Sequence, residues 1–323
     1  MNILLLLGAN PAGDMKGISR RIHYDFLLKL KNNNIVHTYG PWEKDPLLSP
    51  LKYDKSIRFG RILRYYTPDV VIIYSMFCTH SWLPLEFDTS SIPRICIEVD
   101  YWNVTRRARN WYKKYNFNLL IQRGSYTRSV INSVWLPFSA SEDFLPSNKK
   151  KIKDRLREIS FIGRGGGSLG KKGYYYPIRR EALRRLLEDK LVNIIGRVSP
   201  EVYPSFLSKY FCYFCDSGRF DSAPAKTFEI MASGAALFTT PFRKYRKLFN
   251  GKKVCFFYDK DLVDVKDKAR ELLNLSNDEI QEIVNTGVEE IKRQHLDSHR
   301  VEDLQEVLHS YLRQGNIVQK WGI

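Results

Sequence analysis

The sequence lacks any long hydrophobic run. The first run, at residues 2–7, has only five apolar residues before Gly8. A membrane-spanning helix needs about 18 or more apolar residues in succession, and a secretory leader needs a cationic start that is missing here. Residues 2–7 are therefore expected to form a buried strand, and the protein is expected to be soluble and cytoplasmic.

Cysteine is also scarce. The five cysteines are an odd number, and most lie in apolar runs, as Cys96 does. This pattern excludes a disulfide scaffold and indicates buried free thiols in a reducing compartment. Cys212 and Cys215 form a CxxC pair without a second pair, and His295 and His299 lie on an otherwise charged helix. We expect a strand at the first pair, solvated histidines at the second, and no metal site.

Acidic residues are few, with 35 Asp and Glu against 52 Lys and Arg, a formal charge of +17. The chain is 43% hydrophobic with 19 Gly and 14 Pro, so it can bury a core, and disordered and collagen-like classes are excluded. The cationic excess indicates anionic partners such as nucleic acid, anionic lipid or phosphorylated ligands. Residues 1–150 carry +9 and residues 151–323 carry +8, so the excess is not confined to one tail.

Apolar strands alternate with helices along the chain, an order that predicts parallel α/β sheets with right-handed crossovers. A polar, Pro-containing stretch at 139–157 interrupts the pattern, which then restarts, so two α/β domains are expected. Strands are predicted at 2–7, 35–38, 70–74, 94–99, 118–122, 134–137, 159–162, 192–195, 211–214, 236–239 and 254–258, and helices at 19–30, 57–65, 105–115, 177–188, 200–207 and 226–232, with three more helical segments after them.

Two acids with seven residues between them, Asp221 and Glu229, form the sharpest polar constellation. The small residues 222–225 let the backbone approach a ligand, and the first N–H groups of the helix near Lys226 have no intrahelical partner. A diphosphate fits such donors, and the flanking carboxylates could accept hydrogen bonds from sugar or ribose hydroxyls. The alternative is that Asp221 caps the helix and Glu229 is a solvated helical residue.

This segment resembles the signature of GT-B glycosyltransferases of the group 1 (family 4-like) type, with Asp221 where Glu is usual. The run 227–234 is similar to that family's helix followed by glycine and strand. Gly163-Arg164 with 171–173 is similar to its Gly-Arg and Lys-Gly pair, although this loop is longer, and 194–198 resembles the part that holds the nucleotide base. The likeness is good over about 130–275 and faint before it.

The resemblance implies an α/β fold of two Rossmann-like domains facing a cleft, the GT-B fold. An N-terminal acceptor-side domain would span 1–146 and a nucleotide-sugar donor domain 147–297. A C-terminal helix and tail at 298–323 could pack back on the N-terminal domain.

The resemblance also implies roles for residues of the donor domain. Glu229 would bind the donor ribose and Asp221 the hydroxyls of the transferred sugar. Basic residues of the glycine-rich loop would neutralise the leaving diphosphate, whose charge grows as the glycosidic bond breaks. The implied donor-binding set is Arg164, Gly165, Lys171, Lys172, Arg197, Val198, Ala225, Lys226, Thr227 and Glu229.

On the acceptor side, Gly13 and Gly17 flank Asp14 in the first loop, and Asp100 follows the strand at 94–99. The family usually has a catalytic or donor-orienting residue, often His, at the place of Asp100. If Asp100 is the general base the reaction would invert the sugar; without a base there, retention is the alternative. The catalytic candidates are therefore Asp14, Asp100 and Asp221.

A basic helix with interleaved aromatics is expected at 105–115. It could give a peripheral contact with anionic membrane or with nucleic acid; the alternative is a solvated amphipathic helix. The stretch 149–157 adds further cations for a large anionic acceptor or surface. The cations of the helix are Arg106, Arg107, Arg109, Lys113 and Lys114.

Taken with the charge, the motifs predict an enzyme that moves a sugar from a UDP- or GDP-linked donor to an acceptor hydroxyl, without a cofactor or required metal. The acceptor is expected to be a glycan, a lipid-linked intermediate or another anionic macromolecule. The alternative is a nucleic-acid-associated protein, which either binds without catalysis or glycosylates a modified DNA base.

Overall fold

The computed structural model describes residues 1–7, 26, 29–32, 34–40, 53–54, 56–75, 83–84, 86–87, 91–98, 112–124, 131–145, 150–163, 177–199, 201–216, 221–315, 317–318 and 320–321. These residues divide into two compact units. The first holds the described residues up to Pro137 together with those from Arg300 onward, and the second holds Phe138–His299. The sequence analysis placed the domain boundaries at 146/147 and 297/298, whereas the structure divides the chain at 137/138 and 299/300.

The first unit is built on a six-stranded parallel sheet with the order β2-β1-β3-β4-β5-β6. β4 is buried along its whole length, and β1 is buried from its second residue onward, because a parallel sheet is covered on both faces and its strands are therefore continuously apolar. The strands are β1 (Asn2–Leu7), β2 (Ile35–Tyr39), β3 (Val70–Ser75), β4 (Arg94–Glu98), β5 (Leu119–Gln122) and β6 (Ser133–Trp135), and the short α2 spans Phe59–Leu63.

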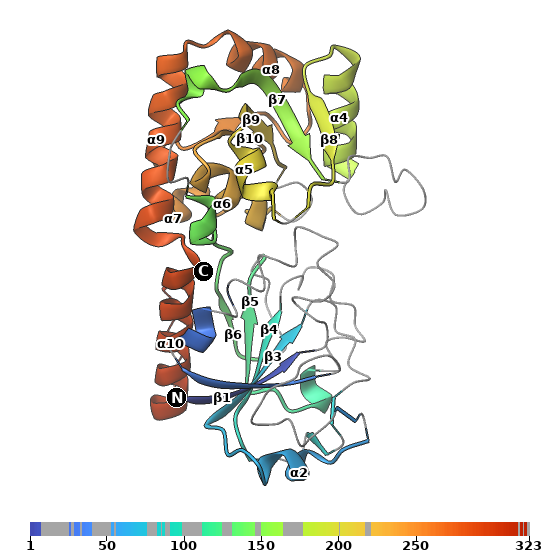
Figure 1. Ribbon diagram of the computed structural model, residues 1–323, viewed down its shortest axis with the longest axis vertical. Helices are drawn as coiled ribbons and strands as arrows, with labels where there is room; N and C mark the ends of the chain where they lie inside the picture. Colours follow the sequence, from blue (N-terminus) through green and yellow to red (C-terminus); the bar gives the residue numbers. More distant parts are fainter. Residues whose placement is uncertain are drawn as a thin grey trace. The chain divides into compact units, whose positions relative to one another are not determined.

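The second unit has a five-stranded parallel sheet with the order β11-β10-β9-β7-β8 (Figure 1). The chain leaves β7 toward β8 on one side and later returns to β9 on the other. In such sheets, ligands bind beyond the carboxyl ends of the two strands where the order reverses. The strands are β7 (Leu156–Ile162), β8 (Asn193–Gly196), β9 (Tyr210–Phe214), β10 (Ala236–Thr239) and β11 (Phe256–Phe257).

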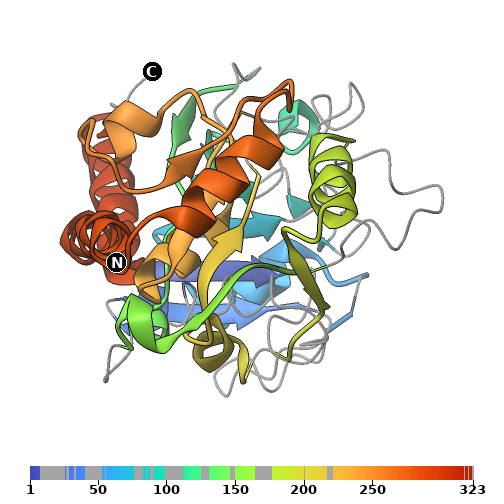
Figure 2. The same ribbon diagram turned by 90° about the horizontal axis from the view of Figure 1, so that it is seen from above.

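Helices surround the second sheet, and Figures 1 and 2 show α4 and α9 on opposite sides of this unit. Apolar residues of α4, α8 and α9 join those of the strands in one buried core. The helices and 3-10 turns are η3 (Glu142–Phe144), η4 (Ile152–Asp154), α4 (Pro177–Glu188), α5 (Tyr203–Leu207), α6 (Ala225–Ala232), α7 (Tyr245–Leu248), α8 (Val265–Asn274), α9 (Asn277–Gln294) and α10 (Asp297–Gln314).

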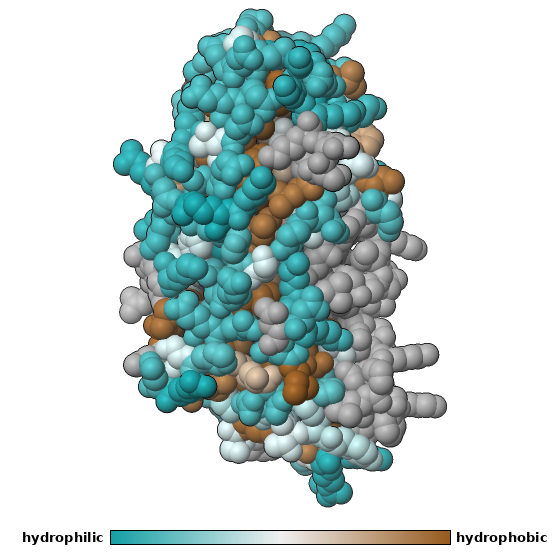
Figure 3. Space-filling model, turned by 60° about the vertical axis from the view of Figure 1, so that its left-hand side comes forward, coloured by the Kyte–Doolittle hydropathy of each residue, from teal (hydrophilic) through white to brown (hydrophobic). Residues whose placement is uncertain are grey.

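Hydrophilic residues dominate the described surface of the face drawn in Figure 3, where apolar residues form only narrow streaks. The large apolar side chains that are exposed lie far apart in the sequence, such as Ile35, Tyr65 and Val263. Single exposed apolar residues of this kind are normal in folded proteins. Within the described residues, no helix is both long and apolar enough to span a membrane.

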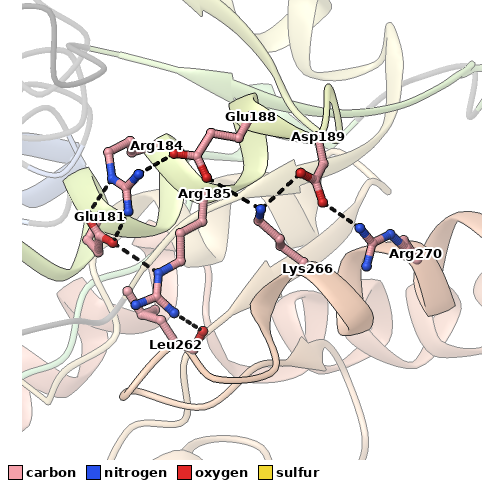
Figure 4. A network of polar contacts seen from close by, with 8 residues as sticks. All are labelled: Glu181, Arg184, Arg185, Glu188, Asp189, Leu262, Lys266 and Arg270. Carbon is pink, nitrogen blue, oxygen red and sulfur yellow. Dashed lines mark hydrogen bonds and ion pairs between the residues drawn. The ribbon is translucent and has the colours of Figure 1, made fainter.

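An ion-pair network joins α4 to α8 (Figure 4). On α4, Arg184 pairs with Glu181 at 2.6 Å, and between the helices Lys266 pairs with Asp189 at 2.9 Å. Hydrogen bonds from Arg184 and Arg185 lower the pKa of the Glu181 carboxyl to about 2. Arg184 itself is more than half exposed, so solvent and salt weaken these attractions and the network adds little to stability.

A buried guanidinium holds the inner part of the second unit together. Arg155 is only 6% exposed, and its nitrogens donate to four backbone carbonyls. The acceptors are the carbonyls of Lys150 at 3.2 Å, Leu207 at 3.1 Å, Tyr210 at 3.4 Å and Ser233 at 2.8 Å. Burial lowers the pKa of Arg155 to about 10, so the group stays charged at neutral pH.

The first unit is completed by the segment from Arg300 onward. Arg300 donates from Nε to the carbonyl of Pro137 at 3.0 Å and lies over the Trp321 ring at 4.5 Å. The carboxylate of Asp303 accepts hydrogen bonds from Arg300 at 3.0 Å, Trp321 Nε1 at 2.9 Å and Lys320 Nζ at 2.5 Å. Two distant parts of the sequence are thereby joined in one unit.

Two details differ from the sequence-based expectations. His295 was expected to be solvated, but it is fully buried at the end of α9, with Nε2 2.7 Å from the Leu248 carbonyl and its ring beside Phe228 and Phe249. The short α7 was not predicted because four residues are too few for an amphipathic period. The prediction of buried free thiols is confirmed at Cys96, Cys212, Cys215 and Cys255.

Candidate functional site

Polar side chains gather at the carboxyl ends of β7 and β9, the reversal point of the second sheet. β7 ends at Ile162, and Gly163 follows with φ of +140° and an N–H bond of 2.7 Å to the Gly196 carbonyl. β9 is followed by Cys215 and Asp216, both buried. This is the place where an open α/β sheet presents a ligand site.

Lys226, the second residue of α6, brings a cation to this point. Its ammonium donates to the Ile162 carbonyl and lies 5.3 Å from the centre of the Phe161 ring. The positive φ favours glycine at position 163, where a Cβ would also come within 3.3 Å of Lys226 Nζ. Burial lowers the pKa of Lys226, and the nearby Arg179 lowers it further, while the Glu229 carboxylate opposes the shift.

A second cation lies beside Lys226. Arg179, in the first turn of α4, donates from Nε to Asp216 Oδ2 at 2.6 Å, and its guanidinium carbon is 5.9 Å from the Phe161 ring. Asp216 is 4% exposed. Sequence reasoning missed this pair, although a cation in a first helical turn faces the positive end of the helix dipole. Because a cation is unfavourable at that end of a helix, its presence there indicates a nearby anionic group, which in this case is Asp216.

Glu229 lies in the middle of α6 and is fully buried. Its Oε2 accepts a hydrogen bond of 2.9 Å from the hydroxyl of Tyr203, the first residue of α5. The alternative of a solvated Glu229 is therefore wrong. Buried carboxylates are retained where partners compensate their charge, and the nearby Lys226 and Tyr203 provide such compensation.

The start of α6 has the form that was expected of an anion site. Pro224 precedes the helix in an extended conformation and offers no side-chain cap to Ala225 and Lys226. Thr227 is fully buried, and its Oγ1 has no hydrogen-bond partner within the described part of the chain. Helix N–H groups and an unsatisfied buried hydroxyl at the same helix end favour a polar ligand.

Asp221 lies in the turn that leads to α6, with a positive φ of 50°. Its Oδ1 accepts hydrogen bonds from the backbone N–H of Arg243 at 2.9 Å and from Lys260 Nζ at 2.6 Å. The side chain is 41% exposed. Asp221 thus fastens the turn to the segment after β10, and it does not cap α6, because its carboxylate bonds elsewhere. Its role toward a sugar stays a prediction.

The other predicted donor residues divide into two groups. Arg197 is exposed and Val198 half-buried, directly after β8 and next to the Gly163–Gly196 contact. The remaining predicted residues of both units lie outside the described residues. These are Gly13, Asp14, Gly17, Asp100, Arg106, Arg107, Arg109, Arg164, Gly165, Lys171 and Lys172.

The first unit has a buried polar cluster that sequence reasoning missed. Glu98 ends β4, is fully buried and accepts a hydrogen bond of 3.1 Å from Tyr112. Gln122 and Arg123, at the end of β5, are also buried. Tyr112 begins the described end of the predicted basic helix, where Lys113 and Lys114 are exposed. In this described part of the helix, Tyr112 is buried and the two lysines are exposed.

Within the described residues, no group of three or more His, Cys, Asp and Glu side chains could hold a metal ion. The CxxC thiols of Cys212 and Cys215 are fully buried, and burial raises the pKa of Cys215 to about 11. A thiol with so high a pKa is a poor nucleophile and metal ligand at neutral pH. The polar groups described at this site include Lys226, Arg179, Glu229, the Thr227 hydroxyl and the first N–H groups of α6.

Comparison with known proteins adds independent findings. Residues 153–306 match a family described as glycosyl transferase-like, and no curated protein sequence matches the chain. The fold is similar to sucrose-phosphate synthase from Thermosynechococcus elongatus, with TM-score 0.61, 11% identity and coverage of 98% of this chain and 100% of that chain.

Two further solved structures have similar folds. An α-glucosyltransferase in complex with UDP and a mismatched DNA gives a TM-score of 0.60 at 9% identity, with 95% of this chain and 98% of that chain covered. A glycosyltransferase from Rickettsia africae gives 0.57 at 11% identity, with 98% and 99% covered. At such low identities the likeness concerns the fold alone.

Proposed function

We propose that the chain, whose residues 153–306 match the glycosyl transferase-like family and whose fold is similar to that of GT-B glycosyltransferases, transfers a sugar from a UDP- or GDP-linked donor to an acceptor hydroxyl. The observation that carries this proposal is the position of Lys226 and Glu229. Both lie on α6 where the order of the second sheet reverses, one as a cation and the other as a buried carboxylate. A nucleoside diphosphate needs both kinds of partner.

In the proposed reaction, the Glu229 carboxylate accepts hydrogen bonds from the ribose, and Lys226 with the first N–H groups of α6 faces the diphosphate. Negative charge grows on that diphosphate as the glycosidic bond breaks, so a fixed ammonium nearby stabilises the transition state more than the ground state. The cations would serve in place of a metal ion. Asp221 would meet the sugar, and Asp14 and Asp100 stay predictions for the acceptor side.

Similar structures support the choice of nucleotide. α-Glucosyltransferases with folds like this one were solved with UDP and with UDP-glucose. The proposal therefore puts UDP-sugars first and GDP-sugars second.

A calorimetric screen of UDP-, GDP-, CDP- and dTDP-sugars, with Mg²⁺ and with a chelator, tests the proposal. We expect one nucleotide class to bind equally well under both conditions and to support sugar transfer or slow donor hydrolysis. Absence of binding by every donor would refute a nucleotide-sugar enzyme. Binding that disappears with the chelator would refute only the metal-independent part.

The distribution of charge in the second unit supports an anionic acceptor. No acid occurs between Glu229 and Asp259, whereas six cations lie in and around α7, one of which, Lys252, pairs with Glu290 of α9. Lys244, Lys247 and Arg243 are close enough to repel one another: burial and these like charges lower the pKa of Lys244 to about 8. Because Arg243 also bonds to Asp221 through its N–H, this basic segment adjoins the predicted sugar end of the donor site. The six cations are Arg243, Lys244, Arg246, Lys247, Lys252 and Lys253.

This charge gives a prediction about pH. With a pKa of about 8, Lys244 is mostly charged at pH 7 and mostly neutral by about pH 9. The salt concentration that elutes the protein from a heparin column should therefore fall over this range. Lys244→Arg keeps its charge and should show a smaller fall. An identical fall for both proteins would show that Lys244 does not contribute to polyanion binding.

A further inference from the structure

The hydrogen bond between Tyr203 and Glu229 connects two elements at the proposed donor site. Tyr203 is 1% exposed and Glu229 is 0% exposed, and 2.9 Å separates the hydroxyl from Oε2. We infer that Tyr203 is a positioning residue that sets the ribose selectivity of this site, because it fixes the Glu229 carboxylate for ribonucleotides over 2′-deoxyribonucleotides. This inference rests on the proposed function of the site.

Tyr203 is itself held firmly in place. Its ring packs edge to face against Phe144 of η3, with 5.6 Å between ring centres and an interplanar angle of 80°. A tyrosine has only two side-chain torsions, so a ring buried in this way also fixes the direction of its hydroxyl. The carboxylate of Glu229 therefore meets a donor that cannot move to follow it.

The hydroxyl also keeps its proton under all working conditions. Burial raises the pKa of Tyr203 well above its ordinary value, and the charge of Glu229 raises it further. The hydroxyl therefore always donates and Oε2 always accepts. A fixed donor at Oε2 restricts the rotation of the carboxylate and favours one orientation toward a pair of adjacent hydroxyls.

Selectivity follows from the cost of unmatched hydrogen bonds. A site that is built to bind a substrate hydroxyl rejects the analogue without it, because buried acceptors then lose their donor. A carboxylate that can rotate loses less binding free energy when the 2′-hydroxyl is absent, because it can turn toward another donor. Removal of the Tyr203 hydroxyl should therefore weaken the binding of UDP. It should also reduce the ratio between the affinities for UDP and dUDP.

A second buried tyrosine provides the matched control. Tyr213 on β9 is also 1% exposed, and its hydroxyl donates at 2.6 Å to the carbonyl of Phe206 in α5. Both tyrosines thus connect to α5, but only Tyr203 donates to Glu229. Tyr213→Phe removes the same atom from the same neighbourhood and leaves the carboxylate untouched.

The experiment compares the wild-type chain with Tyr203→Phe, Tyr213→Phe and Glu229→Gln. Calorimetry gives the affinities for UDP and dUDP, and for GDP and dGDP. We expect the wild type to prefer the ribonucleotide by about tenfold or more, Tyr213→Phe to keep this ratio, and Tyr203→Phe and Glu229→Gln to bring it close to one. For a variant of low stability, the rise in melting temperature with each nucleotide gives the same comparison.

Each other result has a definite meaning. If Glu229→Gln loses the selectivity and Tyr203→Phe keeps it, the donor site stands and the role of Tyr203 is refuted. If Tyr213→Phe loses it as well, a general loosening of α5 is responsible and the inference fails. If the wild type binds none of the four nucleotides, the proposed function fails and the inference fails with it.

Discussion

Replacement of Glu229 by glutamine should reduce the affinity for the nucleoside diphosphate about 10- to 100-fold and reduce sugar transfer at least as much. Glutamine has nearly the same shape, so α6 should still form and the amide oxygen can still accept from Tyr203. The negative charge is lost, however, and hydrogen bonds to charged groups are worth about 1.5–3 kcal/mol. Calorimetric titration with UDP and GDP measures the effect.

Glu290 offers a control for this experiment. It is another buried carboxylate of the second unit, on α9, where it is 1% exposed and paired with Lys252 and Arg293. Glu290→Gln should lower the melting temperature and leave nucleotide affinity unchanged. Wild-type affinity in Glu229→Gln would remove Glu229 from the donor site.

The largest loss of stability is expected from Arg155→Met. The methionine fills part of the space but donates nothing, so four backbone carbonyls lose their buried donor. Each buried carbonyl left without a donor costs about 1–3 kcal/mol, so the loss of all four hydrogen bonds should cost several kcal/mol. For a unit of this size we expect the melting temperature to fall by about 10 °C, as measured by circular dichroism or calorimetry.

Arg184→Ala is the matched surface control. Arg184 pairs with two carboxylates, those of Glu181 and Glu188, but its side chain is 57% exposed (Figure 4). Its removal should hardly change the melting temperature, and about 1 M salt should erase the remaining difference. Equal losses in the two variants would show that burial of the guanidinium is not what makes Arg155 important.

The sequence predicted the architecture well because the apolar runs are unambiguous. α4, β1 and β10 have the predicted bounds, and β9 agrees to within one residue. Continuous burial on both faces explains this success: the strands needed no alternating pattern to be recognised. β11 is shorter than predicted because only Phe256 and Phe257 pair with β10.

Partnerships between distant residues were not predictable from the sequence. The pairs Arg179–Asp216 and Tyr203–Glu229 join residues 37 and 26 positions apart, and nothing in local spacing indicates either one. Motif reasoning identified Glu229 because its helix has a recognisable signature. It could not identify the hydroxyl that holds it, because α5 has no signature of its own.

The excess of Lys and Arg in the sequence did not predict which groups the individual cations bind. The run at 149–157 was interpreted as a surface for an anionic acceptor, but Arg155 binds backbone carbonyls inside the unit. Arg157 donates to the Leu273 carbonyl at 3.1 Å and to Asn277 at 2.9 Å. Composition counts charges without showing where they point. The excess around α7 is the better candidate because its acids are missing over a continuous stretch.

The division of the first unit has a consequence for how the protein is made. Residues up to Pro137 leave the ribosome before the second unit. Arg300, which bonds to the Pro137 carbonyl, and Lys320 and Trp321, which complete the cluster around Asp303, are synthesised after the second unit. Domains usually fold in order of emergence. Here the second unit, continuous from 138 to 299, can finish folding first. The first unit would lack the contacts of Arg300 and of the residues after it until translation has passed the second unit.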